Sequence, residues 1–287
     1  MVLQMPAELL ARARMLAAGG PWDPPPTRNA ATVVLLRDGP AGLEVLLMRR
    51  PDSMAFAPGM HVFPGGRVDM PQDGMPPIRG ALPAGAWAGE ALAAALIVAG
   101  VRETFEEAGV LLAVDRAGRP AAHDENWALD RLASETAGGF PAMLQRRRLH
   151  IQADLLVPLA HWVTPEVETR RFDTRFLVAA LPDGQDVDAH ATETASAHWH
   201  APSDALAEHR LGRLAMLPPT VAVLADLAAH PSVVDAMGWA RTQEVVPLMP
   251  RARMTGGLLR WELVHAYTGE VLAGADEPAG SEERGVR

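Results

Sequence analysis

Apolar positions in the first 70 residues predict one short helix and then extended structure. Near the N-terminus, Leu9, Leu10, Leu16 and Ala17 recur with the spacing of an amphipathic helix. The segments AATVVLLRD and LEVLLMRR, separated by the turn-forming DGPAG, predict a hairpin or two neighbouring strands. Between helix and strands, AGGPWDPPPTR predicts a linker, and APGMHVFPGGRVDM later predicts a strand fragment that enters a loop.

Further along the chain the apolar spacing becomes that of longer helices. A helix is predicted over residues 89–108, closed by Gly109, a residue suited to the left-handed position after a helix. The helical pattern of residues 124–149 is broken by a glycine pair. The other predicted elements are strands near 110–114, 155–163, 172–180, 195–200, 244–254 and 259–266, and helices at 201–212, with Ser203 or Asp204 as N-cap, and 218–230. Because regular βαβ alternation is absent, this order predicts an α+β fold.

The end of the helix at 89–108 carries a dense group of charges. Glu103, Glu106 and Glu107 fall at i, i+3 and i+4, so their carboxylates share one arc of the helix, while apolar side chains face the other way. Neighbouring carboxylates repel one another, so their grouping indicates that a cation binds between them. Because all the ligands would be oxygen atoms, Mg²⁺ or Mn²⁺ is favoured over zinc. A solvated Glu-Glu pair is the ordinary alternative, but Arg102 beside it and FPGG upstream favour phosphoryl chemistry at a metal.

Composition narrows the class of protein. The chain of 287 residues has a net charge of −9, which argues against non-specific binding to nucleic acid or to an anionic membrane. The absence of cysteine excludes a thiol nucleophile and thiolate metal ligands, and it is consistent with the cytoplasm, the expected location. No apolar run reaches the roughly 18 to 20 residues of a membrane span, and the N-terminus lacks the order of a signal peptide.

Two motifs resemble the halves of the Nudix box, G-x5-E-x7-R-E-U-x-E-E-x-G-U, in which U is a bulky apolar residue. FPGGRVD, residues 63–69, resembles the first half, and RETFEEAGV, residues 102–110, resembles the second. An insertion splits this box, because 35 residues separate Gly66 from Arg102. The box also requires a glutamate eight residues before Arg102, but that position is Ala94. Glu90 is a candidate to replace the missing acid.

The insertion points to one branch of the family. Proteins similar to the peroxisomal coenzyme A diphosphatases also have a long insertion inside the box. Four further segments resemble that branch: HVFPGG (61–66), HWVTPEVETRRFDTRF (161–176), HWHAPSDAL (198–206) and LPPT (217–220). The resemblance therefore covers most of residues 30–225.

The resemblance implies an α/β/α Nudix sandwich, with a mixed sheet between helices, and roles for the matching residues. Glu106 and Glu107 would be metal ligands, together with the carbonyl of Gly66. Glu103 would be a ligand or the base that activates water, and Arg102 would orient it.

Further site residues are predicted outside the acidic helix. The resemblance also implies a catalytic acid from a late loop, for which Glu193 is the candidate, with a solvated loop acid as the alternative. Arg170, Arg171 and Asp173 are candidates for binding substrate phosphates, with structural Arg–Asp pairing as the alternative. Gly65 is a further substrate-binding candidate.

The predicted organisation follows from these elements. Residues 1–27 would form the N-terminal helix and linker, and residues 28–230 the Nudix domain. Within that domain, 70–88 would be the insertion and about 120–150 a helical elaboration. Residues 231–287 would extend the C-terminus, and added helices are expected towards that end of the chain.

The expected reaction is hydrolysis of a nucleoside diphosphate linked to another group, and the resemblance implies that the substrate is coenzyme A or an acyl derivative. A broader ADP-ribose or NADH diphosphatase and a catalytically silent nucleotide sensor are the alternatives. The expected partner is thus a nucleotide-type small molecule, and the assembly is left open, a homodimer included.

Overall fold

The computed structural model describes residues 7–54, 57–68, 75–83, 88–136, 138–188 and 196–273. These residues divide into two compact units. The smaller unit takes its described residues from 7–28, 161–174 and 246–273, and the larger from 29–160 and 175–245. Within the described part of the chain, none of the helices has the length and apolar character that a membrane crossing requires.

The larger unit is built on a sheet with the strand order β10-β2-β1-β9-β8. Its strands are β1 (Arg28–Gly39), β2 (Gly42–Arg49), β8 (Val157–Val163), β9 (Phe172–Ala180) and β10 (Ser196–His200), with β3 (His61–Val62) beside β2 and β4 (Gly65–Arg67) beside β1. The predicted hairpin is confirmed, because β1 and β2 pair antiparallel from Leu36↔Val45 to Gly39↔Gly42.

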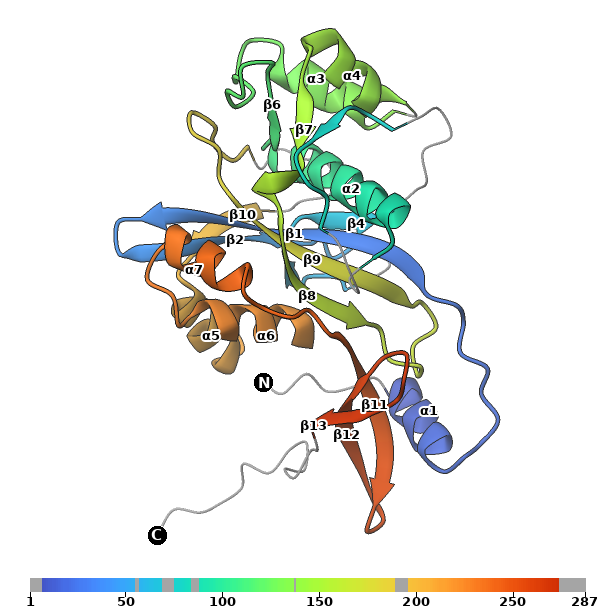
Figure 1. The fold of residues 1–287 in the computed structure, drawn as a ribbon. Coiled ribbons are helices and arrows are strands. Elements are labelled where there is room, and N and C mark those ends of the chain that lie inside the picture. Colours follow the sequence, from blue (N-terminus) through green and yellow to red (C-terminus); the bar gives the residue numbers. More distant parts are fainter. Residues whose placement is uncertain are drawn as a thin grey trace. The chain divides into compact units, whose positions relative to one another are not determined.

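Helices cover both faces of this sheet, as Figure 1 shows. α2 (Glu90–Ala108) lies on one face, and α5 (Pro202–Arg210), α6 (Pro218–Leu227) and α7 (Val233–Ala240) lie on the other. At Gly100 of α2, a Cβ would stand 3.1 Å from Cγ2 of Val33 and 3.4 Å from Cδ1 of Leu177, so the glycine allows the helix to approach β1 and β9 closely. The predicted α+β sandwich is confirmed.

The helical elaboration of the larger unit contains two helices and a small sheet. The helices are α3 (Trp127–Ser134) and α4 (Gly139–Arg147), and the predicted break lies between them. The small sheet has the order β5 (Ile78–Arg79), β7 (His150–Gln152) and β6 (Ala113–Val114), followed by a 3₁₀ turn at Ala153–Leu155. β5 and β7 are too short to give a sequence pattern, and they were not predicted.

The strand predicted at 110–114 is shorter than expected. The side chain of Gln185 accepts a hydrogen bond from the Leu111 N–H at 2.9 Å and donates one to the Leu111 carbonyl at 3.0 Å. Leu111 therefore bonds a distant side chain instead of a neighbouring strand, and only Ala113–Val114 forms β6.

The smaller unit joins the N- and C-terminal parts of the chain. It contains α1 (Ala7–Ala17), β11 (Pro247–Thr255), β12 (Leu258–His265) and β13 (Val271–Ala273), together with the adjoining ends of β8 and β9. β11 pairs parallel with β8 at Pro247↔His161 and antiparallel with β12. The two late strands are thus confirmed, whereas β13 was not predicted.

One local prediction at the last helices is wrong, and the position of one helix was not predicted. Ala201 is the N-cap of α5, rather than Ser203 or Asp204, because Pro202 occupies the first turn, where its fixed φ is favourable. Added helices are expected towards the C-terminus, but the position of α7 was not predicted, since its eight residues begin with two β-branched valines and include Gly238. Its cap is local: the Ser232 hydroxyl accepts a hydrogen bond from the Asp235 N–H at 3.2 Å.

Candidate active site

The site is built around the last two turns of α2. Gly109 ends the helix with φ 70°, and its N–H donates to the Phe105 carbonyl at 3.0 Å, which confirms the predicted stop. Phe105 is fully buried on the side of the core, whereas Glu103 is half-buried. The acidic positions therefore lie where α2 ends, at fixed places relative to the sheet.

Arg102 joins two of the three acids. Its Nη2 lies 2.6 Å from Oε1 of Glu103, and its Nη1 lies 2.7 Å from Oε2 of Glu106. Nη2 also donates to the carbonyl of Arg67, in β4, at 3.4 Å. The guanidinium thus offsets part of the negative charge of the two carboxylates and ties them to the loop of the first half-box.

That loop reaches the acids through its backbone. β4 pairs antiparallel with β1, with Thr32 opposite Gly65 and Ala31 opposite Gly66. The Gly65 N–H donates to Oε2 of Glu107 at 2.9 Å, and a Cβ on Gly66 would stand only 2.3 Å from Oε1 of Glu103. The two halves of the split motif are therefore brought together in space.

Burial sets the electrostatics of Glu106 and Glu107. They are 9% and 6% exposed, in contrast to the solvated face that the ordinary interpretation of a Glu-Glu pair assumes. Burial raises the pKa of Glu106 to about 7, with Arg102 opposing this rise and Glu103 adding to it. Oε1 of Glu106 is buried and has no hydrogen-bond partner among the described residues.

These residues fit a hard divalent cation through their chemistry. They supply carboxylate oxygens, and one of these, Oε1 of Glu106, is buried without a hydrogen-bond partner among the described residues. Gly66 has no side chain, so its backbone lies close to the Glu103 carboxylate. Within the described ranges, no group of three or more His, Asp or Glu side chains is arranged to hold a metal ion. The reason is visible in the contacts, because the carboxylates of Glu103 and Glu106 are turned to Arg102.

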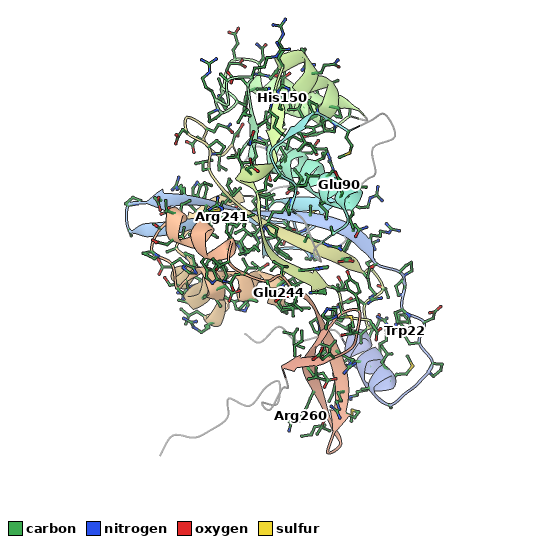
Figure 2. All side chains as sticks on the ribbon, in the orientation of Figure 1. Trp22, Glu90, His150, Arg241, Glu244 and Arg260 are labelled. Carbon is green, nitrogen blue, oxygen red and sulfur yellow. The ribbon has the colours of Figure 1, made fainter. Side chains whose placement is uncertain are left out.

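Glu90 and Ala94 lie on the same helix but away from the acids. Glu90 is the first residue of α2, and it is exposed (Figure 2). At 1.5 Å per residue, it lies about 20 Å along the helix axis from Glu103. Glu90 therefore cannot reach a cation held by Glu106 and Glu107, and no acid of α2 replaces the one missing at Ala94.

Three predicted substrate residues belong to the smaller unit, where two of them make internal contacts. The Arg171 guanidinium donates to the carbonyls of Thr164 and Pro25, both at 3.1 Å. Asp173 is 7% exposed and accepts hydrogen bonds from Tyr267 at 2.7 Å and from His161 at 2.5 Å. Arg170 is exposed. Phosphate binding by these residues stays a prediction, and Glu193 lies outside the described residues.

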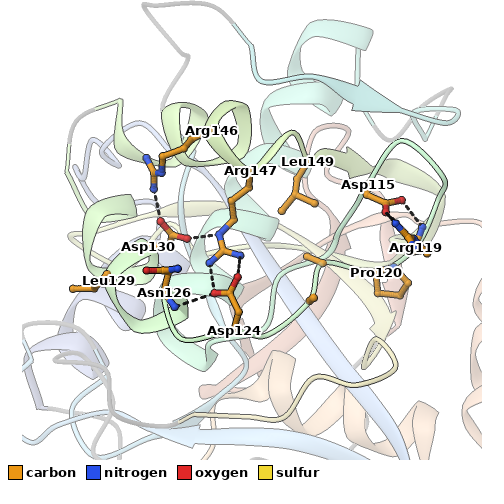
Figure 3. A pocket seen from close by; sticks show the side chains of 12 residues that line it. Asp115, Arg119, Pro120, Asp124, Asn126, Leu129, Asp130, Arg146, Arg147 and Leu149 are labelled. Atoms are coloured by element: carbon orange, nitrogen blue, oxygen red, sulfur yellow. Dashed lines mark hydrogen bonds and ion pairs between the residues drawn. The ribbon is translucent and has the colours of Figure 1, made fainter.

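A cavity of about 910 Å³ lies in the helical elaboration, not at the acids (Figure 3). Its charged groups are paired internally: Arg147 bonds Asp124 at 2.7 Å and also Asp130, and Arg146 bonds Asp130. Because arginine and aspartate balance one another here, the cavity offers no excess charge to a phosphate.

Residues outside the box contact the end of α2, and sequence reasoning missed their role. The Trp127 indole N–H donates to the Gly109 carbonyl at 2.8 Å, and Trp127 is buried. Arg131, one turn later on α3, bonds main-chain carbonyls of α2. An arginine within a helical pattern carries no signal of such a distant contact.

Comparison with known proteins places this arrangement in a family. A family model described as the NUDT19 Nudix domain matches residues 87–227. Acyl-coenzyme A diphosphatase NUDT19 from Homo sapiens is 31% identical over 247 residues, with 71% of this chain and 64% of the human protein covered. The protein of the same name from Gallus gallus is 27% identical over 271 residues, with 77% of this chain and 68% of that protein covered. The chain thus spans roughly two thirds of the length of these curated relatives.

A solved structure extends the similarity to the fold. The crystal structure of a NUDIX hydrolase from Alicyclobacillus acidocaldarius is 32% identical to this chain, with a TM-score of 0.65. The match covers 74% of this chain and 96% of the bacterial one. With its two half-boxes in contact and this likeness over nearly the whole of a solved relative, the chain belongs to the Nudix hydrolase family.

Proposed function

We propose that this protein hydrolyses the diphosphate bond of a nucleoside diphosphate linked to another group, and that its substrate is coenzyme A or an acyl-coenzyme A. The observation that carries the proposal is the contact between the half-boxes, in which Gly65 bonds Glu107 across 42 positions of sequence. The substrate is supported by the name of the human relative, acyl-coenzyme A diphosphatase. The products would be a phosphopantetheine and adenosine 3′,5′-bisphosphate.

In this proposal Glu106, Glu107 and the carbonyl of Gly66 hold Mg²⁺ or Mn²⁺. When bound, the metal polarises phosphoryl oxygens and lowers the pKa of the attacking water. Glu103 either joins the ligands or takes the proton from that water. Arg102, 2.6 Å from Glu103, would fix the direction of its carboxylate.

The test compares coenzyme A, an acyl-coenzyme A, NADH and ADP-ribose side by side in the presence of Mn²⁺. We expect coenzyme A or its acyl form to have the highest kcat/KM, and Glu107→Gln to lower turnover by at least ~100-fold with the fold preserved. Glu125→Gln, which neutralises an exposed acid in the elaboration, is the matched control and should keep full activity.

Other outcomes lead to the two alternatives. Equal or better turnover of NADH or ADP-ribose would replace the coenzyme A proposal with a broader diphosphatase. Nucleotide binding without any metal-dependent turnover would favour a catalytically silent sensor. The reason to consider a sensor is Ala94, which stands where the Nudix box has an acid.

A further inference from the structure

Arg131 binds the end of α2 from outside the Nudix box. Its Nε donates to the main-chain carbonyl of Glu106 at 2.8 Å, and its Nη2 donates to that of Glu107 at 2.9 Å. Its Nη1 donates to the carbonyl of Asp188 at 2.7 Å and lies 3.5 Å from the Asp188 carboxylate. The residue is only 6% exposed, so its guanidinium bonds groups inside the protein and not solvent.

The geometry suits the end of a helix. The last four carbonyls of a helix lack partners within it and carry the negative end of the helix dipole. A guanidinium offers planar, forked donors that can bond two successive carbonyls at once, whereas an ammonium acts as a point charge. Arg131 therefore satisfies two carbonyls of α2 and neutralises the helix end in one contact.

The two carbonyls belong to the residues whose side chains are the proposed metal ligands. Holding the peptide units of Glu106 and Glu107 fixes where their Cα–Cβ bonds point. Other contacts hold the same turn: Trp127 bonds the Gly109 carbonyl, and the Asp188 N–H donates to the Ala108 carbonyl at 3.0 Å. Without Arg131, the helix end would keep these neighbours but lose the bonds at the ligand positions.

We propose that Arg131 is a positioning residue, which acts through the backbone of Glu106 and Glu107 to set the carboxylates for the metal ion. This inference rests on the proposed function for its metal ligands. It gives the helical elaboration a role in the reaction, because α3 lies outside the box but supplies the arginine that bonds the end of α2. Arg131 itself touches neither substrate nor metal.

The experiment measures Mn²⁺ binding without substrate, by the electron paramagnetic resonance signal of free Mn²⁺, in Arg131→Lys and Arg131→Gln. Loss of a group that orients metal ligands typically weakens metal binding by about 10- to 100-fold, and we expect a rise of Kd in this range for Arg131→Gln and a smaller one for Arg131→Lys. Amide exchange at residues 106–111 should become faster in both variants.

Two controls separate positioning from general damage. Arg119→Gln removes an exposed arginine of the same elaboration that bonds Asp115, and it should leave the Kd for Mn²⁺ unchanged. Val101→Ala lowers stability by opening a cavity on the core side of α2, and it too should leave the Kd near the wild-type value. Where Arg131→Gln does not fold, Trp127→Phe removes the indole bond to Gly109, together with part of the ring contact with Phe105, and should weaken Mn²⁺ binding by ~3- to 10-fold.

The outcomes distinguish this inference from the proposed function. A folded Arg131→Lys protein with wild-type Kd and wild-type exchange at residues 106–111 overturns the positioning role, whatever the activity. Wild-type protein that binds Mn²⁺ but hydrolyses no diphosphate overturns the proposed function alone. Wild-type protein that binds no Mn²⁺ overturns both.

Discussion

At the scale of single residues, the site depends on two positions that must lack a side chain. A Cβ on Gly65 would lie 2.6 Å from the Ala31 carbonyl oxygen, inside the contact between β4 and β1. A Cβ on Gly66 would lie 2.3 Å from the carboxylate of Glu103. Both glycines are explained by close approach, since neither has a positive φ.

The first prediction concerns Gly66→Ala. The added methyl group must displace the Glu103 carboxylate, the proposed ligand or base, so we expect kcat to fall by at least ~10-fold through the loss of productive geometry. Gly238→Ala in α7 is the matched control, because a Cβ there meets nothing within 4 Å and activity should be unchanged. Circular dichroism would verify that both variants fold, and equal kcat in the two would contradict the assigned contact.

At the scale of elements, the hairpin of β11 and β12 carries a buried ion group. Glu262 is 8% exposed and lies 2.6 Å from Nη2 of Arg251 and 3.3 Å from Nη1 of Arg253. Burial alone would raise the pKa of Glu262, but the hydrogen bonds and charges of the two arginines outweigh it and hold the pKa below its ordinary value. The carboxylate therefore stabilises the smaller unit in its ionised form.

The second prediction follows from the sign of this shift. A lowered folded-state pKa gives stability that is present above the unfolded-state pKa and is lost as the pH falls through the folded-state value. Glu262→Gln should therefore lower the free energy of unfolding by about 1 to 2 kcal/mol at pH 7, with the difference shrinking below pH ~4. Urea unfolding at several pH values measures it, and a difference independent of pH would refute the ionic explanation.

Elements with local signals could be predicted, and those fixed by distant contacts could not. α2 was predicted because its apolar face is periodic and Gly109 marks its end. The length of β6 was not, because Gln185 bonds Leu111 across 74 positions of sequence. The three acids and the two glycines of the site follow from motif spacing, whereas the bonds from Arg131 depend on how α3 packs. No pattern within the α3 sequence encodes that packing.

At the scale of the whole molecule, a net charge of −9 and buried acids make bound cations stabilising. An ion that binds only the folded state adds about 2.7 kcal/mol at 100 times its Kd. This energy should appear in the larger unit, since α2 belongs to it.

The third prediction is therefore thermal. Saturating Mn²⁺ should raise the Tm of the wild-type transition by about 5 to 10 °C relative to protein in chelator. Glu107→Gln should remove most of this rise, while Glu262→Gln, which lowers stability in the smaller unit, should retain it. An equal rise in wild type and Glu107→Gln would assign the stabilising ion to another part of the molecule.

The separation of the half-boxes has a consequence for chain entropy. Closing a loop of 35 residues instead of the 13 of an unsplit box costs only about 0.9 kcal/mol more, because the cost grows with the logarithm of length. The bonds that Gly65 and Arg67 make to α2 can offset a difference of that size. The length of the intervening segment is thus nearly free to vary, and new contacts can be added there without disturbing the end of α2.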